Sequence, residues 1–334
     1  MPTRTSSRSP RLARTSLFRK IDTTGLGRQR EHLLTMKAAK VSLRRDETVR
    51  DGLLRSFDRL TDSIERQSLR PQDDEEITHQ VRTTIKWFRS LLRLIRPGVE
   101  PAFFEQENER LRNAARLLSS ARDSEVARDT LKNLPVNEHT GRQAVDAALS
   151  GLEPRIQREK AQQPNLNEAK EHFQETLSRF RRLKFQGTEQ HIVEAAIRKV
   201  YRQGRQRMKE AIRTDEDVAY HRWRIRAKNL YYELRFLESV WPKRLHRIVS
   251  RLSKLQDRIG LDHDLAVLRA ELKRTPGTFG GKERVGRIVL CLDGQIKELR
   301  SSAVPLGHKI WRDRPKRFAR HLVRHWQKNK SESV

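Results

Sequence analysis

Two stretches of the chain place a histidine and several basic residues at helical spacing. The first contains His79, Arg82, Lys86, Arg89 and Arg93. The second contains His221, Arg224, Lys228 and Arg235. Steps of three and four residues place each set on one face of an α-helix, and we call these faces the first and second stripes. Arginine offers a bidentate fork to phosphate oxygens and lysine a mobile point charge, so the chemistry indicated is anion binding.

Neither stripe is accompanied by local acids. No Asp or Glu occurs from His79 to Arg96 or from His221 to Tyr232. Exposed helices usually mix both charges and gain from i,i+4 pairs, whereas like charges at this spacing cost stability. A bound anion therefore explains the stripes better than the alternative, a solvated charged face. A histidine among cations should stay neutral near pH 7 and donate one N–H to the anion, or else only orient its neighbours.

More basic residues flank the second stripe. Arg226 adds charge beside it, and Arg202 and Arg205 lie on one side of a helix predicted over 189–213. If that helix packs beside the one predicted over 215–240, their basic sides line one groove.

Helices must position these residues, since Leu, Arg, Glu, Ala and Gln dominate the sequence and Gly and Pro are few. We predict an all-α protein. Apolar residues back both stripes, for example Phe88 in the first and Leu230 in the second. The helices are predicted at 46–67, 73–96, 102–120, 123–133, 139–160, 166–184, 189–213, 215–240, 243–259, 262–273, 282–302 and 313–327, with breaks at residues such as Gly260 and Pro305.

The two stripes form part of an internal repeat. Placing His79 over His221 also matches Arg82 with Arg224, Lys86 with Lys228 and Arg93 with Arg235. The repeat predicts two pseudo-symmetric helical-bundle halves, 46–187 and 188–330, around a basic central groove or channel. Residues 1–45 are predicted to be a basic, largely flexible extension that becomes helical over 33–45.

The overall charge narrows the range of partners. The chain has 334 residues and a formal net charge of +29, which attracts polyanions over a long range. Candidates are nucleic acid, an anionic membrane surface or an inorganic polyanion. The single cysteine, Cys291, excludes an intrachain disulfide and predicts a reducing cytoplasmic location. No apolar run is long enough for a membrane span.

The chain resembles the CHAD family, the conserved histidine α-helical domain. The resemblance rests on His79–Lys86, His221–Lys228, YRQGRQRM at 201–208, KLQDRIGLDHDLAVL at 254–268 and RPKRFARHLVRHW at 314–326. It implies two helical halves around a basic channel, binding of inorganic polyphosphate and, in some members, association with polyphosphate granules. The binding residues it implies are His79, Arg82, Lys86, Arg89, Arg93, Arg202, Arg205, His221, Arg224, Arg226, Lys228, Arg235 and Lys254.

Two other functions remain open. The same basic surfaces, and the N-terminal arm in particular, fit nonspecific nucleic-acid binding, although no standard nucleic-acid module is apparent. The pair His263-Asp264 is also found in metal phosphohydrolases, but neighbouring residues on a helix point different ways. We interpret the acids at 262–264 as caps and dipole partners at a helix start. The expectation is a protein without catalysis, metal or cofactor.

Overall fold

The computed structural model describes residues 41–68, 74–118, 122–135, 141–161 and 165–331. Within these ranges the chain forms eleven α-helices and no strand, which confirms the all-α prediction. The helices are α2 (Val49–Ser68), α3 (Asp74–Ile95), α4 (Pro101–Leu117), α5 (Arg122–Lys132), α6 (Arg142–Ala161), α7 (Leu166–Arg181), α8 (Glu189–Thr214), α9 (Asp217–Phe236), α10 (Pro242–Arg274), α11 (Lys282–Ile310) and α12 (Pro315–Ser331). None of the described helices is long and apolar enough to cross a bilayer.

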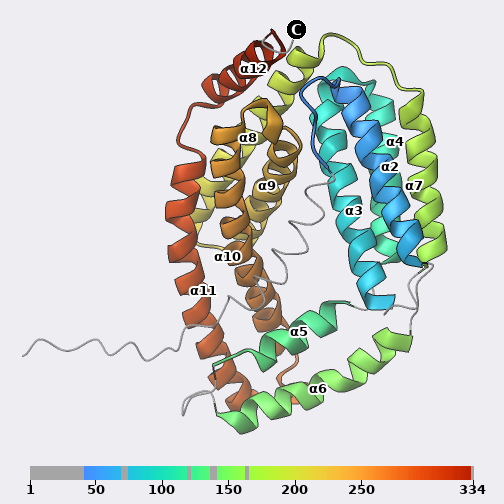
Figure 1. Cartoon of the computed structure of the whole chain (residues 1–334). Coiled ribbons are helices and arrows are strands. Elements are labelled where there is room, and N and C mark those ends of the chain that lie inside the picture. The colour runs from blue at the N-terminus through green and yellow to red at the C-terminus, as the bar shows by residue number, and fades with distance from the viewer. Residues whose placement is uncertain (1–40, 69–73, 119–121, 136–140, 162–164, 332–334) are drawn as a thin grey trace, which may run out of the picture.

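The first bundle consists of α2, α3, α4 and α7, which lie side by side in Figure 1. Its core is aromatic. Phe88 of α3 stacks on Phe57 of α2 with 3.8 Å between ring centroids, and meets Phe173 of α7 edge-on at 5.3 Å. Because α3 packs on several neighbours, it is buried over most of its circumference, and its stripe occupies the remaining partly buried side.

The second bundle contains α8 to α12. Two glycines allow its helices to approach closely. A Cβ added at Gly204 of α8 would lie 2.6 Å from Trp311 Nε1, and one at Gly307 of α11 would lie 2.7 Å from Trp223. Tyr201 fixes the end of α11, since its hydroxyl donates to the Ile310 carbonyl at 2.8 Å.

The two bundles share one hydrophobic core, which draws residues from α2 to α4 and from α7 to α10. Trp87 of α3 packs on Tyr232 of α9 with 4.6 Å between ring centroids. One turn further along α3, the Ser90 hydroxyl donates to the Asn229 carbonyl at 3.1 Å. The two halves predicted from the sequence are therefore packed together in the region that carries the stripes.

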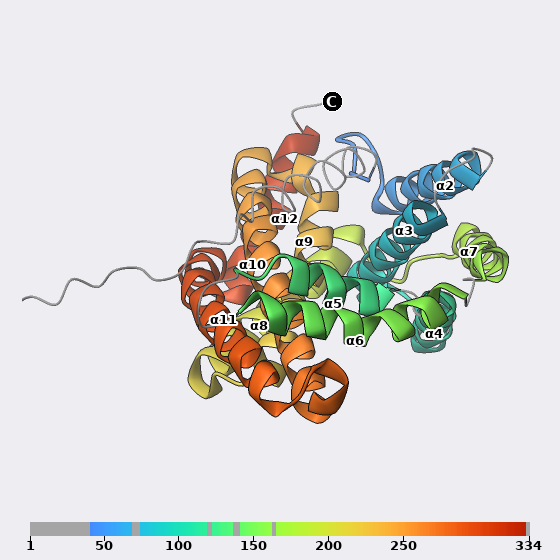
Figure 2. The same cartoon turned by 90° about the horizontal axis from the view of Figure 1, so that it is seen from below.

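A second core lies at one end of the molecule. There α5 and α6, from the first half of the sequence, pack on the later part of α10 and the first part of α11 (Figures 1 and 2). Leu131 and Leu152 are fully buried in this cluster, and Cys291 is also buried there, as expected for a small core residue. Chain from the first half thus completes the core of the second.

Three sequence predictions about elements were wrong. Gly260 does not end a helix, because α10 continues from Pro242 to Arg274, and α11 continues through Pro305 to Ile310. Packing along both sides of these positions outweighs the helix penalty of one Gly or Pro. Residues 41–45 are not helical but are packed in place: Leu43 is buried, and its N–H donates to the Phe236 carbonyl at 2.7 Å. The rest of the predicted extension lies outside the described residues.

Candidate anion-binding site

The second stripe lies against α10. His221 of α9 and His263 of α10 meet through their Nδ1 atoms at 3.2 Å, so one ring donates and the other accepts. Burial, together with the nearby Arg224, His221 and Lys228, lowers the pKa of His263 to about 4. Burial and Arg224 also lower the pKa of His221. Both rings are therefore neutral near pH 7, as the cationic neighbours predict.

The contact of His263 with His221 was not predicted from the sequence. We interpreted residues 262–264 as a helix start, but the structure places them inside α10, where they cannot cap it. The spacing from Gly260 to His263 is a signal that could have identified this face. A Cβ added at Gly260 would lie 3.9 Å from Arg224 Nε, an ordinary contact distance, so this side of α10 lies next to Arg224.

The first stripe is held against α4. Arg82 donates to the Leu118 carbonyl at 2.6 Å, and Arg89 Nε lies 3.4 Å from Asn108 Oδ1. Arg93 folds back to donate to the Arg89 carbonyl at 2.7 Å. These three side chains and Lys86 are partly buried. His79 lies in α3, but its side chain is outside the part that the structure describes.

The stripe helices meet around Glu233, a buried residue of α9 with 1% of its surface exposed. Burial raises the pKa of Glu233 well above its usual value, although Arg93 and Arg226 both act to lower it. Its Oε2 atom has no hydrogen-bond partner. Burial, with help from neighbouring cations such as Arg226, lowers the pKa of Arg93 to about 10. Burial and Arg207 likewise lower the pKa of Arg226.

Other helices neutralise the edges of the second stripe. Arg235 pairs with Glu238, which also accepts from His246 Nδ1 at 2.8 Å. Glu210 of α8 pairs with Arg207 and lies 3.4 Å from Arg222. Arg235–Glu238 and Arg207–Glu210 are each three residues apart, so their spacing already indicates these pairs, although both acids lie outside the acid-free run.

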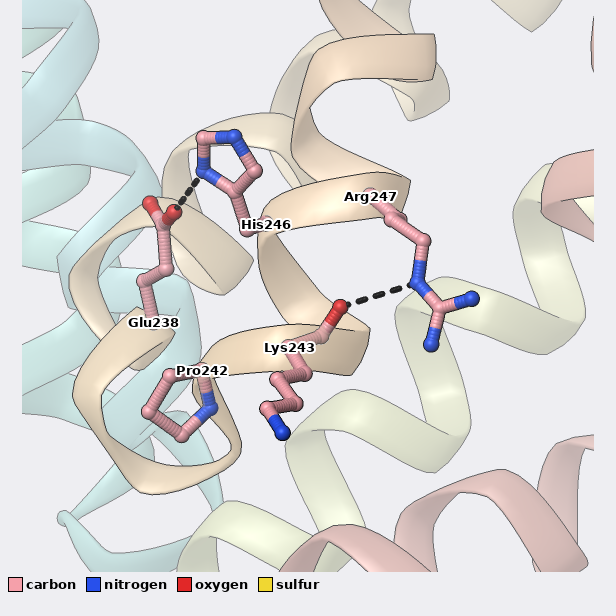
Figure 3. Close-up of a pocket in the computed structure, with 5 residues that line it drawn as sticks. All are labelled: Glu238, Pro242, Lys243, His246 and Arg247. Carbon is pink, nitrogen blue, oxygen red and sulfur yellow. Dashed lines mark hydrogen bonds and ion pairs between the residues drawn. The ribbon is translucent and has the colours of Figure 1, made fainter.

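The pair Glu238–His246 borders a surface cavity of about 510 Å³ at the start of α10 (Figure 3). Pro242, Lys243 and Arg247 complete its lining, and Arg247 Nε donates to the Lys243 carbonyl at 3.0 Å. The lining of this cavity includes the acid Glu238, and His246 is exposed. We therefore do not include the cavity in the candidate anion site at the stripes.

Three of the residues predicted to bind lie apart from the stripes. Arg202 is exposed, and Arg205 Nη1 lies 3.4 Å from the Asp313 carbonyl at the joint between α11 and α12. The arginine by which α8 approaches α9 is Arg207 instead. Lys254 is exposed and nine residues before His263, which places it on the opposite side of α10. The structure does not bring these three to the His221–His263 pair.

A buried ionic network holds the start of α9. Arg300 of α11 donates to Asp262 Oδ1 at 2.8 Å and to Asp217 Oδ1 at 2.5 Å, and also contacts Asp215. Burial opposes the charge of Arg300, but these carboxylates raise its pKa overall. Asp217 lies one turn before His221, so the network fixes the position of that histidine relative to α10.

The sequence that forms these helices matches a known protein family. A sequence model of the CHAD domain matches residues 28–273, which include both stripe helices and almost all of α10. The helices α11 and α12 lie beyond the matched region, as does the segment 314–326 that contributed to the resemblance. A search of curated proteins finds no match.

Proposed function

The chain belongs to the CHAD family, and we propose that it binds inorganic polyphosphate at the two stripes and His263. CHAD domains are associated with polyphosphate binding in general. The residues of the proposed site are Arg82, Lys86, Arg89, Arg93, His221, Arg224, Arg226, Lys228 and His263, with His79 expected to join them. A central groove between the stripes is part of this proposal, as is association with polyphosphate granules.

The observation that carries the proposal is mutual repulsion among partly buried cations. The pKa of Arg93 is lowered by burial and by Arg89 and Arg226. The pKa of His263 is lowered by burial and by Arg224 and Lys228. Placing charges together at the cost of desolvation is unfavourable unless an anion relieves the repulsion. A chain of phosphates supplies this charge and has no bases that need aromatic partners.

The arginines, lysines and histidines of the proposed site contribute to binding in different ways. Arginine forks grip pairs of phosphate oxygens, and Lys86 and Lys228 act as mobile charges. A neutral His221–His263 pair adds an N–H donor without further repulsion. A bound phosphate chain favours the protonated, positively charged form of His221 or His263. The affinity for polyphosphate should therefore increase as the pH is lowered.

The proposal is tested with the full chain carrying Arg82→Glu and Arg224→Glu. We expect polyphosphate affinity, measured by calorimetry, to fall at least roughly 100-fold, since two charge-assisted hydrogen bonds of about 1.5 kcal/mol each are lost. Arg274→Glu with Arg284→Glu is the matched control, because both residues are exposed cations far along the chain from the stripes. Circular dichroism reports whether each variant keeps its helices.

A second variant separates binding from folding, because Arg82 also donates to the Leu118 carbonyl. Arg82→Gln with Arg224→Gln keeps polar groups of similar length and should fold. Wild-type affinity in this folded variant would refute the proposal. Competition with DNA at matched phosphate and salt measures selectivity, and equal displacement would refute a preference for polyphosphate.

We further propose that the chain binds polyphosphate without hydrolysing it. The pairing of His263 Nδ1 with His221 occupies the ring nitrogen on one side of a potential phosphohydrolase residue. Phosphate release is to be measured with magnesium and with manganese. Turnover that is lost in His263→Ala would show instead that the chain is an enzyme.

A further inference from the structure

A second basic surface lies on the outside of the second bundle, where α8 and α12 pack together. Tyr201 of α8 stacks on Phe318 of α12 with 4.5 Å between ring centroids, and its hydroxyl accepts from the Asp313 N–H at 3.2 Å. These contacts bury the facing sides of the two helices. Their outward sides remain exposed, and we call these together the outer basic face.

The charge of this face is almost entirely positive. No Asp or Glu occurs from Ala195 to Lys209 on α8, or from Arg314 to Lys330 on α12. The exposed cations that define the face are Arg198, Arg202 and Lys209 of α8 and Arg317, Arg320 and Arg324 of α12. At 1.5 Å per residue, the three positions on α8 span about 16 Å and those on α12 about 10 Å.

The outer basic face is separate from the stripes. On α8, Arg207 lies towards Arg226 of α9, whereas Arg202 lies five residues earlier, about 140° around the helix. None of the α12 cations lowers the pKa of any stripe residue whose shift is given above. Two basic regions with different surroundings are therefore present on one chain.

The outer basic face has few exposed side chains that could bind groups other than phosphates. Among the described residues, the exposed large hydrophobic side chains are Ile212, Val218, Ile225, Val267 and Leu290, so α8 carries one, near its end, and α12 none. The aromatic residues Phe318 and Trp326 of α12 are buried. Base stacking on a single strand and apolar insertion into a membrane both need exposed rings or aliphatic side chains.

We propose that the outer basic face binds the sugar-phosphate backbone of a duplex nucleic acid without reading its sequence. A duplex hides its bases and presents two rows of phosphates to an open surface. Two rows of exposed arginine and lysine match that pattern in charge and extent. Because its exposed cations lie on two helices that pack together, the face suits a broad partner better than a single thread.

The test uses the full chain with Arg202→Gln, Arg320→Gln and Arg324→Gln. Binding of a 20-bp DNA duplex is measured by fluorescence anisotropy from 50 to 200 mM salt. We expect weaker binding and a salt slope reduced by about 2 to 3, as three phosphate contacts are lost. The matched control is Arg274→Gln, Arg284→Gln and Lys297→Gln, three exposed cations elsewhere, which should change the slope much less.

Polyphosphate binding of the same variant separates this inference from the proposed function, on which it does not rest. Polyphosphate affinity should remain within about threefold of wild type, as these positions lie away from the stripes. An unchanged DNA salt slope would overturn the inference. So would an equal loss of polyphosphate affinity, or a loss of binding to anionic vesicles without loss of DNA binding. A duplex RNA of the same length should behave like the DNA.

Discussion

At the residue scale, Glu233 and His263 have shifted pKa values, and the two shifts have opposite effects on how stability changes with pH. Glu233 is a buried acid that favours its protonated form, and His263 is a partly buried base that favours its neutral form. Each of these side chains is therefore uncharged in a region that contains several arginines. Their effects on stability can be separated by measuring each against a neutral replacement.

We predict that Glu233→Gln stabilises the protein increasingly as pH rises. A folded-state pKa above 4.5 means that the native state retains a proton that the unfolded state releases, so wild-type stability declines as pH rises between the two pKa values. The slope is about 1.4 kcal/mol per pH unit within that window. Urea unfolding of both proteins at pH 5 and 8 measures it. A difference between the two proteins that does not change with pH would contradict the prediction.

The prediction for His263→Gln has the opposite sign. Because the folded pKa, about 4, lies below the usual 6.5, the unfolded state binds a proton first. The stability that neutral His263 contributes is fully present above pH 6.5 and is lost as pH falls towards 4. We expect the glutamine variant to lose less stability than wild type between pH 6.5 and 5. Thermal unfolding at these pH values, with His246→Gln as the exposed control, tests this.

At the element scale, glycines decide how closely the helices of the second bundle approach. A Cβ at Gly260 would make an ordinary contact with Arg224 at 3.9 Å. A Cβ at Gly204 would lie only 2.6 Å from Trp311 Nε1, and Trp311 is buried. Of these two, only Gly204 is therefore required for close packing, whereas the structure has space for a Cβ at Gly260.

Alanine substitutions should separate these two roles. We predict that Gly260→Ala stabilises the protein by about 0.5–1 kcal/mol, because the mid-helix penalty of glycine is removed without a clash. Gly204→Ala should destabilise it by about 1–3 kcal/mol through overpacking. Denaturant midpoints report both effects. If Gly260→Ala proved strongly destabilising, α10 would approach the second stripe more closely than the structure shows.

At the scale of the whole molecule, the two halves share their cores. Trp87 contacts Tyr232 across the bundles, and α5 and α6 pack on α10 and α11. The chain segment before α2 also bonds to the end of α9. The repeat predicts a boundary near residue 187. Separating the chain there would expose large apolar surfaces on both halves.

We therefore predict that fragments 46–187 and 188–330 do not fold independently. Each should show helical signal without a cooperative thermal transition, because each lacks part of its core. Co-expression of the two fragments should restore a complex with cooperative unfolding, measured by calorimetry after co-purification. Two fragments that unfold cooperatively when alone would establish two independent domains. The pseudo-symmetry of the halves stays a prediction in either case.

Much of this protein could be predicted from local sequence. Helix propensity and apolar spacing predicted an all-α chain, and the acid-free spacing of Arg224 and Lys228 predicted a basic helix face. These properties depend on residues within a few turns of one helix, so periodicity alone reveals them. The same reasoning predicted breaks at Gly260 and Pro305, which were wrong because packing of the flanking residues outweighs a penalty at one position.

Only the tertiary structure decided which charges meet. It brought His263 of α10 to His221 of α9 and placed Glu233 of α9 beside Arg93 of α3. It left Arg202 of α8 exposed, whereas Arg207 of the same helix lies towards Arg226 of α9. The His221–His263 and Arg93–Glu233 contacts join residues on different helices, and the energy of a charge depends on burial and on neighbours within a few ångströms. Helical spacing determines a face, but packing determines what that face meets.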